Sequence, residues 1–277
     1  MHKSLKIKKQ MFLILCILMS SCENKYNFQN NNNLDIIVIQ AILTNEYKNQ
    51  TILISKMLSN PTETINCVTD ATVEVKTKNH TYTFAHNNQN PGEYISTEKF
   101  IATIDNYYNL IVKHNQQQYT AYTKVLPVAP FDSIRFAYDT NQKKYYIDYI
   151  AEVFDPFQSA MYQINIDWTS VQQDTTTNTS PPKALTYFFT LKTVDINQIF
   201  SPPSEQIFFP ESTKVTVTKY SLTPQFEKYI RTMLYETQWA GSLFDVQHGF
   251  ITTNIEGGAI GFFTASCVYK KEFLVKK

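Results

Sequence analysis

The sequence predicts a mainly β protein with two domains, an immunoglobulin-like β-sandwich followed by a second β-rich domain with one C-terminal packed helix. Three observations predict this fold class. The 277-residue chain contains 18 tyrosines and 19 phenylalanines among many Thr, Ile and Val residues, which favour strands. Short apolar or alternating segments recur between turn-forming residues, as in all-β domains. One segment, 224–240, instead repeats its apolar residues at helical spacing.

The N-terminal 33 residues have a different pattern. Four lysines lead into the apolar run 11–19, which is followed by Ser20, Ser21 and Cys22. This is the layout of a secretory signal peptide that ends at a lipoprotein-type cysteine. The run is well short of the ~20 residues that a membrane-spanning helix needs. We therefore predict a signal peptide over 1–21, acylation of Cys22, and a disordered polar tether over 22–33.

The first domain is predicted over 34–126. It begins with the continuous apolar segment 34–43, which is typical of a buried strand. The segment 71–77 alternates, so Val73 and Val75 are expected to point inward. The other expected strands are 51–58, 81–85, 93–95, 107–113 and 119–125. Short strands separated by regular turns in this way predict an immunoglobulin-like sandwich.

Two prolines within 126–130 mark the predicted domain boundary, because proline stiffens the chain and removes a hydrogen-bond donor. The second domain is predicted over 131–277. Its expected strands are 131–138, 144–153, 161–168, 184–193 and 214–220, with a closing strand at 259–270.

The helix predicted over 224–240 has a clear beginning. Thr223 suits the N-cap and Pro224 the first helical position. Its apolar face consists of Phe226, Tyr229, Ile230, Met233 and Leu234. This stripe favours a helix packed on a sheet over a cofactor-binding or partner-binding helix. Gly241 suits the helix stop.

Glycine is concentrated at the C-terminal end, where five of the six glycines follow residue 240. Elsewhere the turns use Asn, Asp and Pro. This segment therefore needs backbone freedom or a close approach that only glycine allows. We interpret Gly257 and Gly258 as a bulge or tight turn that leads into the closing strand.

Charge argues against a nucleic-acid partner. Without the four lysines of the signal, 21 basic and 24 acidic residues remain, a net charge of −3 with no basic stripe. Cys67 and Cys267 are the two cysteines beyond the lipidation site, and two buried thiols are favoured over a disulfide.

No catalytic motif is present: the sequence has no nucleophile elbow, HExxH helix, Walker loop or paired CxxC. We predict no enzyme, no cofactor and no metal. His80, His86, His114 and His248 are interpreted as structural, as are the strand carboxylates Asp148, Asp155 and Asp167. A hydrolytic or metal site built from Asp245, His248 and Glu256 is the less favoured alternative.

Aromatic residues give a weaker indication of recognition. Phe200, Phe208 and Phe209 lie among prolines, and Tyr145, Tyr146 and Tyr149 share one expected strand. Such groups serve protein or sugar recognition when exposed. They are equally expected to fill the core.

Several features stand out together: the signal ending SSC at Cys22, the GEY of the opening β domain, and the runs LPVAPFDSI, QFEKYIRTMLYETQW and NIEGGAIGFFTAS. Together they resemble a lipoprotein family of Bacteroidetes catalogued as domain of unknown function 4249. The tail carries most of this resemblance, through Asn254, Gly257, Gly258, Gly261, Phe262, Ala265 and Ser266. We interpret this tail motif as structural. The segment 242–244 departs from the family pattern, which has an Asn-Pro-Phe-like run there.

The resemblance implies an outer-membrane lipoprotein encoded beside TonB-dependent receptors, with no assigned catalytic residues. The expected function is therefore a non-catalytic accessory or binding subunit of an outer-membrane β-barrel receptor, attached to the membrane through Cys22. A carbohydrate- or protein-binding adhesion module is the alternative, and a periplasmic or surface hydrolase is less favoured. The residues after Cys22 leave the face of the membrane undetermined.

Overall fold

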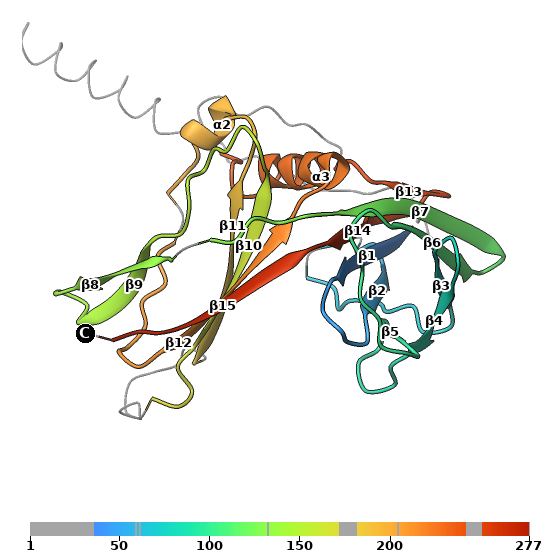
Figure 1. Ribbon diagram of the computed structural model, residues 1–277, viewed down its shortest axis with the longest axis horizontal. Coiled ribbons are helices and arrows are strands. Elements are labelled where there is room, and N and C mark those ends of the chain that lie inside the picture. The colour runs from blue at the N-terminus through green and yellow to red at the C-terminus, as the bar shows by residue number, and fades with distance from the viewer. Residues whose placement is uncertain are drawn as a thin grey trace, which may run out of the picture. The chain divides into compact units, whose positions relative to one another are not determined.

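A nine-stranded sheet dominates the N-terminal half of the computed structural model (Figure 1). Its order is β13-β7-β14-β1-β2-β5-β4-β3-β6, and β6 also pairs with β7. That pairing closes eight of the strands into a barrel, with β13 as an additional strand on β7. The strands are β1 (Ile37–Thr44), β2 (Thr51–Lys56), β3 (Thr72–Lys76), β4 (Thr81–His86), β5 (Glu93–Ser96), β6 (Tyr107–His114), β7 (Gln117–Leu126), β13 (Ile255–Glu256) and β14 (Ile260–Ser266).

The structure describes residues 36–58, 60, 62–131, 133–171, 182–203, 205–241 and 251–276. Nearly all of them belong to one compact unit, 35–57 with 64–277. The described residues 58, 60, 62 and 63 belong to a second unit, in which Asn60 Oδ1 accepts from the backbone N–H and the hydroxyl of Thr62 at 3.2 and 3.1 Å.

Alternation along the strands builds the barrel interior, as the sequence predicts. Val73 and Val75 are 1% and 0% exposed, while the side chains between and beside them lie outside. The same pattern runs along β6 and β7, where Tyr108, Leu110 and Ala121 belong to the same buried core. The predicted mainly β class is confirmed.

The predicted immunoglobulin-like sandwich is not confirmed, because its strands lie in one closed sheet rather than in two packed sheets. The reason is strand β14, which comes from the C-terminal end of the sequence. It pairs in parallel with β1 along its whole length and with β7 at Ala265 and Ser266. The residues predicted to form the first domain therefore close their sheet with a strand from the tail.

A separate four-stranded antiparallel sheet has the order β11-β10-β12-β15. Its strands are β10 (Ala160–Asp167), β11 (Lys183–Thr190), β12 (Lys214–Ser221) and β15 (Val268–Leu274). A hairpin of β8 (Arg135–Asp139) and β9 (Lys144–Tyr149) contributes to the same core, which includes Ile164, Val217 and Phe209. Two backbone hydrogen bonds, of 2.8 and 2.9 Å, join Tyr145 of β9 to Phe209.

Helix α3 (Pro224–Tyr235) packs its apolar face as predicted, with Phe226, Ile230 and Leu234 buried. The Thr223 side chain accepts a hydrogen bond from the Phe226 N–H at 3.2 Å, so the predicted N-cap is confirmed. The helix ends at Tyr235 rather than at residue 240, and turns occupy 236–241. A second, one-turn helix, α2 (Ile196–Ile199), was not predicted.

The predicted closing strand is in fact two strands in two sheets, because the chain passes from β14 to β15 at Cys267 (Figure 1). Ser221 holds this crossover. It exchanges backbone and side-chain hydrogen bonds with Cys267 at 3.0 Å, and its carbonyl accepts from the Ser266 hydroxyl at 2.8 Å. The Ser221 hydroxyl also donates to the Leu126 carbonyl at 2.7 Å. One short segment thus joins the barrel to the four-stranded sheet.

Both cysteines outside the signal region are free thiols. Cys267 is buried, and burial raises the pKa of its thiol. Cys67 is only half-buried, unlike the prediction. Among the described residues, no helix has the length and apolar character needed to cross a membrane.

Candidate functional site

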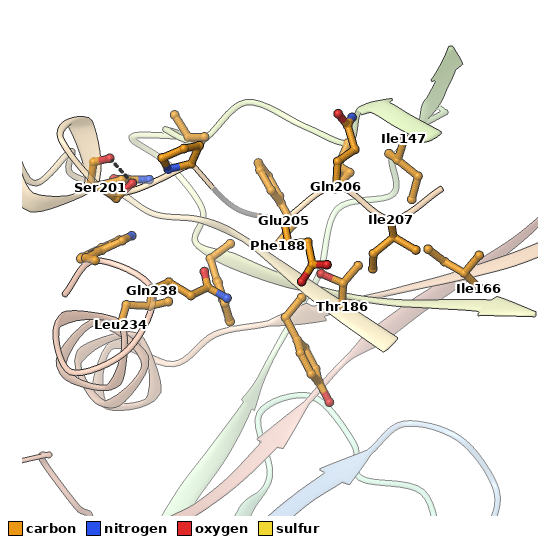
Figure 2. A pocket seen from close by; sticks show the side chains of 17 residues that line it. Ile147, Ile166, Thr186, Phe188, Ser201, Glu205, Gln206, Ile207, Leu234 and Gln238 are labelled. Carbon is orange, nitrogen blue, oxygen red and sulfur yellow. Dashed lines mark hydrogen bonds between the residues drawn. The ribbon is translucent and has the colours of Figure 1, made fainter. Parts of the chain in front are cut away.

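A cavity of about 560 Å³ lies beside the four-stranded sheet (Figure 2). Strands β9 and β11 border it, together with the end of α3 and the segment 198–207. This volume lies within the range of about 300–1,000 Å³ that is usual for small-molecule sites. We call it the sheet pocket.

Helix α2 is held at this pocket by a polar contact with α3. Asp195, the residue before α2, accepts hydrogen bonds from Arg231 and from the Tyr235 hydroxyl, the latter at 2.6 Å. Burial, followed by the Asp195 carboxylate, raises the pKa of Tyr235. Because both partners lie on α3, α2 is anchored to the longer helix, and Gln198 is thereby placed at the pocket.

The apolar part of the lining comes from several elements. It includes Ile147, Ile166, Phe188, Ile207, Leu234 and Trp239. Ile166 and Trp239 are buried, and Tyr235 packs edge-on against Trp239 at 5.3 Å between ring centroids. The Tyr145–Phe209 backbone pairing fixes the segment that carries Ile207. The pocket therefore offers a preformed apolar surface against which the apolar part of a ligand can pack.

The polar part of the lining includes one unsatisfied acceptor. Figure 2 shows Gln238, Glu205 and Thr186 directed toward the same space. In the described part of the chain, Gln198 Oε1 is buried and has no hydrogen-bond partner. An unsatisfied buried acceptor costs about 1–3 kcal/mol. A ligand that carries an N–H or O–H donor would remove that cost.

A second depression, of about 950 Å³, lies between the outer face of the barrel and the first turns of α3. Asn109, Thr120 and Tyr122 form its barrel side, and Gln225 and Lys228 lie on its helix side. We call it the barrel groove. Its base includes Phe262, which stacks on Phe226 of α3 at 4.9 Å.

The tail motif lies at this groove, and Asn254 acts there as a structural residue. Its side-chain amide accepts from the Phe263 N–H at 3.0 Å and donates to the Phe263 carbonyl at 2.7 Å. It also reaches the Tyr122 carbonyl at 3.4 Å. The Asn254 side chain thus forms with Phe263 the two hydrogen bonds that a paired strand would form, at a point where β14 and β7 do not pair directly.

The motif glycines all have positive φ angles. Gly261 has φ +99°, and a Cβ there would lie 2.1 Å from the Ile39 carbonyl oxygen of β1. Gly257 would meet the Gln118 carbonyl at 2.5 Å, whereas Gly258 has open space. Close approach of a neighbouring strand is therefore a requirement at Gly261 and at Gly257, whereas at Gly258 the requirement is only the positive φ of the turn between β13 and β14.

Several predicted positions lie outside the described residues: Cys22, the departure segment 242–244, Asp245 and His248. Glu256 lies on the outer side of β13, where its carboxylate accepts from the Thr120 hydroxyl at 3.4 Å. In the ranges that the structure describes, no three His, Cys, Asp or Glu side chains gather as metal ligands.

The three described histidines have separate local partners. His80 lies 2.6 Å from Glu98, and His86 accepts from the Gly92 N–H at 3.3 Å. The buried His114 ring lies 3.1 Å from an Asp70 carboxylate oxygen. Each contact links neighbouring strands or turns of the barrel region.

The flagged aromatic residues divide between core and surface. Phe209 and Tyr145 are buried, and Phe208 packs against Tyr146. Tyr149 lies under the Arg135 guanidinium at 4.6 Å, and Phe200 is 46% exposed. The core interpretation therefore holds for the two buried residues.

Sequence reasoning missed the sheet pocket. Gln198, Thr186 and Gln238 carry no motif and come from segments that are distant in sequence. Only the proline-rich run around Ile207 was noted as a possible recognition segment. The residues noted there, Phe200, Phe208 and Phe209, do not line the cavity.

The barrel, the four-stranded sheet and the pocket beside it define a mainly β protein whose two sheets share one C-terminal run. The family model described as domain of unknown function (DUF4249) matches residues 23–272. The chain belongs to this family. None of the curated proteins compared with the chain matches it.

Proposed function

We propose that the protein is a lipoprotein anchored to the outer membrane of a Bacteroidetes bacterium through Cys22, and that it is a non-catalytic binding subunit of a TonB-dependent receptor. The observation that carries the proposal is the position of Cys22. It ends a signal-type sequence and directly precedes residue 23, where the family match begins. The residues matched by the family model thus lie within the chain that would remain after cleavage of the signal peptide.

The sheet pocket gives this subunit its ligand site. The apolar part of its lining suits the apolar part of a ligand, and Gln198 Oε1 can accept a hydrogen bond from a ligand donor. Among the described residues of the lining, Glu205 is the only formally charged side chain, so a neutral or cationic donor is favoured over an anion. The ligand class is therefore an amphiphile with a hydrogen-bond donor at one end. In this role the protein presents such a ligand to its receptor.

Lipid attachment is tested by metabolic labelling with an alkyne analogue of palmitate. The wild-type protein is expected to incorporate label, and Cys22→Ala to lose both label and membrane sedimentation. Cys16→Ala is the matched control, because Cys16 is the other cysteine of the leader. Label that persists in Cys22→Ala contradicts the anchor.

The receptor is tested by affinity purification of the tagged wild-type protein from detergent-solubilised envelopes. A β-barrel receptor is expected to co-purify. Isolation of a lone monomer that turns over ester or glycoside substrates would instead establish the hydrolase alternative.

Gln198 gives a test of the pocket itself. Gln198→Leu removes the unsatisfied acceptor, so the free protein should gain about 1 kcal/mol of stability. The same variant should lose the ligand mass that native mass spectrometry detects on wild-type protein purified from envelopes. Gln206→Leu, an exposed amide at the same rim, is the control that should retain it. Equal ligand retention in both variants contradicts the assignment.

A further inference from the structure

Two tyrosines form an exposed stack on the outer face of the barrel. Tyr107 of β6 and Tyr122 of β7 are 50% and 53% exposed, and their rings stack at 5.2 Å with 17° between planes. Cross-strand aromatic pairs stabilise a sheet by roughly 0.2–1 kcal/mol. Stabilisation alone leaves a second feature unexplained, because Tyr122 also lines the barrel groove.

The groove has two walls of different origin. On the barrel wall, Asn109 lies directly opposite Tyr122, and Thr120 directly opposite Glu256, so these four side chains form two adjacent rows. On the helix wall, Gln225 and Lys228 are three residues apart and share one face of α3. Pairing of Asn254 with Phe263 fixes the base of the groove.

Three of these polar side chains are available to a ligand. In the described part of the chain, the side chains of Asn109, Gln225 and Lys228 form no hydrogen bond, and all three are exposed. Asn and Gln each offer both donors and acceptors. Lys228 and Glu256 contribute one positive and one negative charge, so the lining formed by the described residues is neutral overall.

We propose that the barrel groove is a binding site for a neutral carbohydrate chain. A sugar ring has apolar C–H groups on its faces and hydroxyls around its edge, and each hydroxyl both donates and accepts. An aromatic ring face covers the first feature, and amides with one opposite-charge pair match the second. Tyr122 is supported from behind by Tyr107, so its ring is held rigidly at low entropic cost.

This site is distinct from the sheet pocket and does not depend on the receptor-subunit proposal. Of the residues that the structure describes, none lines both cavities. Their proposed ligands also differ in class, an amphiphile for the sheet pocket and a neutral carbohydrate chain for the barrel groove. Either site can therefore fail its test without affecting the other.

The test is isothermal titration calorimetry of the full-length protein in detergent with maltohexaose, cellohexaose and mannohexaose. At least one of these neutral chains is expected to bind. Tyr122→Ala should weaken that binding by about tenfold or more, and Tyr122→Phe should retain it because the ring face remains. Tyr47→Ala, a 71% exposed tyrosine outside the groove, should leave affinity unchanged.

Two further measurements keep the outcome decisive. Tyr107→Ala removes the same ring stack but no groove residue, so it controls for loss of sheet stability and should reduce affinity less than Tyr122→Ala. The dissociation constant should change little between about 0.05 and 0.5 M salt, since the ligand is neutral. The proposal is overturned if none of the three chains binds, if Tyr122→Ala binds normally, or if Phe188→Ala in the sheet pocket abolishes binding.

Discussion

The barrel and the four-stranded sheet differ most in their edges. Each of the eight ring strands pairs on both sides, so the closed sheet has no free ladder. In the four-stranded sheet, β11 and β15 each pair with one described strand. The free side of β11 borders the sheet pocket. Closure of the barrel thus removes free strand edges, while the open edge of the four-stranded sheet leaves room for a cavity that helices and loops complete.

Strand β14 is where the two regions meet, and it serves a different core on each face. Phe263 is 0% exposed in the barrel core, whereas the adjacent Phe262 is 5% exposed and packs against α3. Adjacent strand residues point to opposite faces. Substitutions on the two faces of β14 should therefore affect the two cores separately.

The largest effect is expected from Phe263→Ala. Removing a buried phenylalanine costs about 3–5 kcal/mol, and here the cavity would open inside the closed barrel. Phe262→Ala should cost less overall and should act on α3, through loss of its stacks with Phe226 and Tyr229. Urea unfolding gives the totals, and amide hydrogen exchange locates them. Protection lost from the same amides in both variants would show that the two cores are not separable.

The next effect is expected from Gly261→Ala, at about 2–4 kcal/mol. The added Cβ would press on the Ile39 carbonyl and disrupt the β1–β14 pairing that closes the barrel. Gly258→Ala is the matched control: its φ is also positive, at +89°, but nothing lies within 4 Å of the added Cβ. It should cost only the backbone strain, about 1–2 kcal/mol. Stability is measured by thermal unfolding. If both variants lost the same stability, backbone strain and not the contact with Ile39 would account for the effect of Gly261→Ala.

The local pattern of apolar and polar residues was enough to predict most strands, because this pattern is contained within each strand. The segments that became β3, β6 and β12 begin and end within one residue of their predicted limits. The N-cap at Thr223 was equally local. Faces and caps are encoded within a few neighbouring residues, so sequence reasoning reaches them.

Strand neighbours were not predictable in the same way. Strand β14 is buried on both faces, and no local pattern shows that it lies between β1 and β7, because both strands are far from it in the sequence. The change of sheet at Cys267 interrupts no apolar pattern, so one continuous strand was expected there. The sheet pocket depends on that same long-range arrangement, since its lining comes from separate segments.

Alkaline pH offers a third comparison between the regions, through Tyr220 of β12. Burial, then the charge of Glu46, raises the pKa of Tyr220 to about 12. An unfolded tyrosine loses its proton near pH 10. The folded state therefore holds the proton longer, and the resulting stability is full below about pH 10 and is lost as pH rises to about 12.

The loss attributed to Tyr220 should be about 2–3 kcal/mol. Tyr220→Phe should flatten the decline of stability between these pH values, even though it also gives up the hydrogen bond to Gln163 at 3.2 Å. The barrel control is Tyr94→Phe, whose hydroxyl donates to the Val68 carbonyl at 3.1 Å. Burial raises the pKa of Tyr94 as well, but a hydrogen bond from the Ala71 N–H opposes the shift. Urea unfolding at stepped pH would contradict this account if both variants flattened the curve equally.

The smallest effect is expected at Thr223, the cap of the helix that covers the open sheet. Thr223→Ala removes the acceptor for the Phe226 N–H and should cost about 1 kcal/mol. Thr223→Ser should retain most of that stability because its hydroxyl can accept the same bond. At the other end of α3, the exposed Thr237 hydroxyl donates to the Met233 carbonyl at 2.7 Å, and Thr237→Ala should stay within about 0.5 kcal/mol of wild type.

The Thr223 cap also affects how α3 is held against β14. Phe226 follows the cap and stacks on Phe262, so fraying of the first turn would loosen α3 from β14 while the barrel ladder stayed intact. Thr223→Ala should therefore speed hydrogen exchange at the start of α3 and leave exchange in β1 unchanged. If β1 amides also exchanged faster, the helix would be part of what keeps the barrel closed, and the two regions would unfold as one.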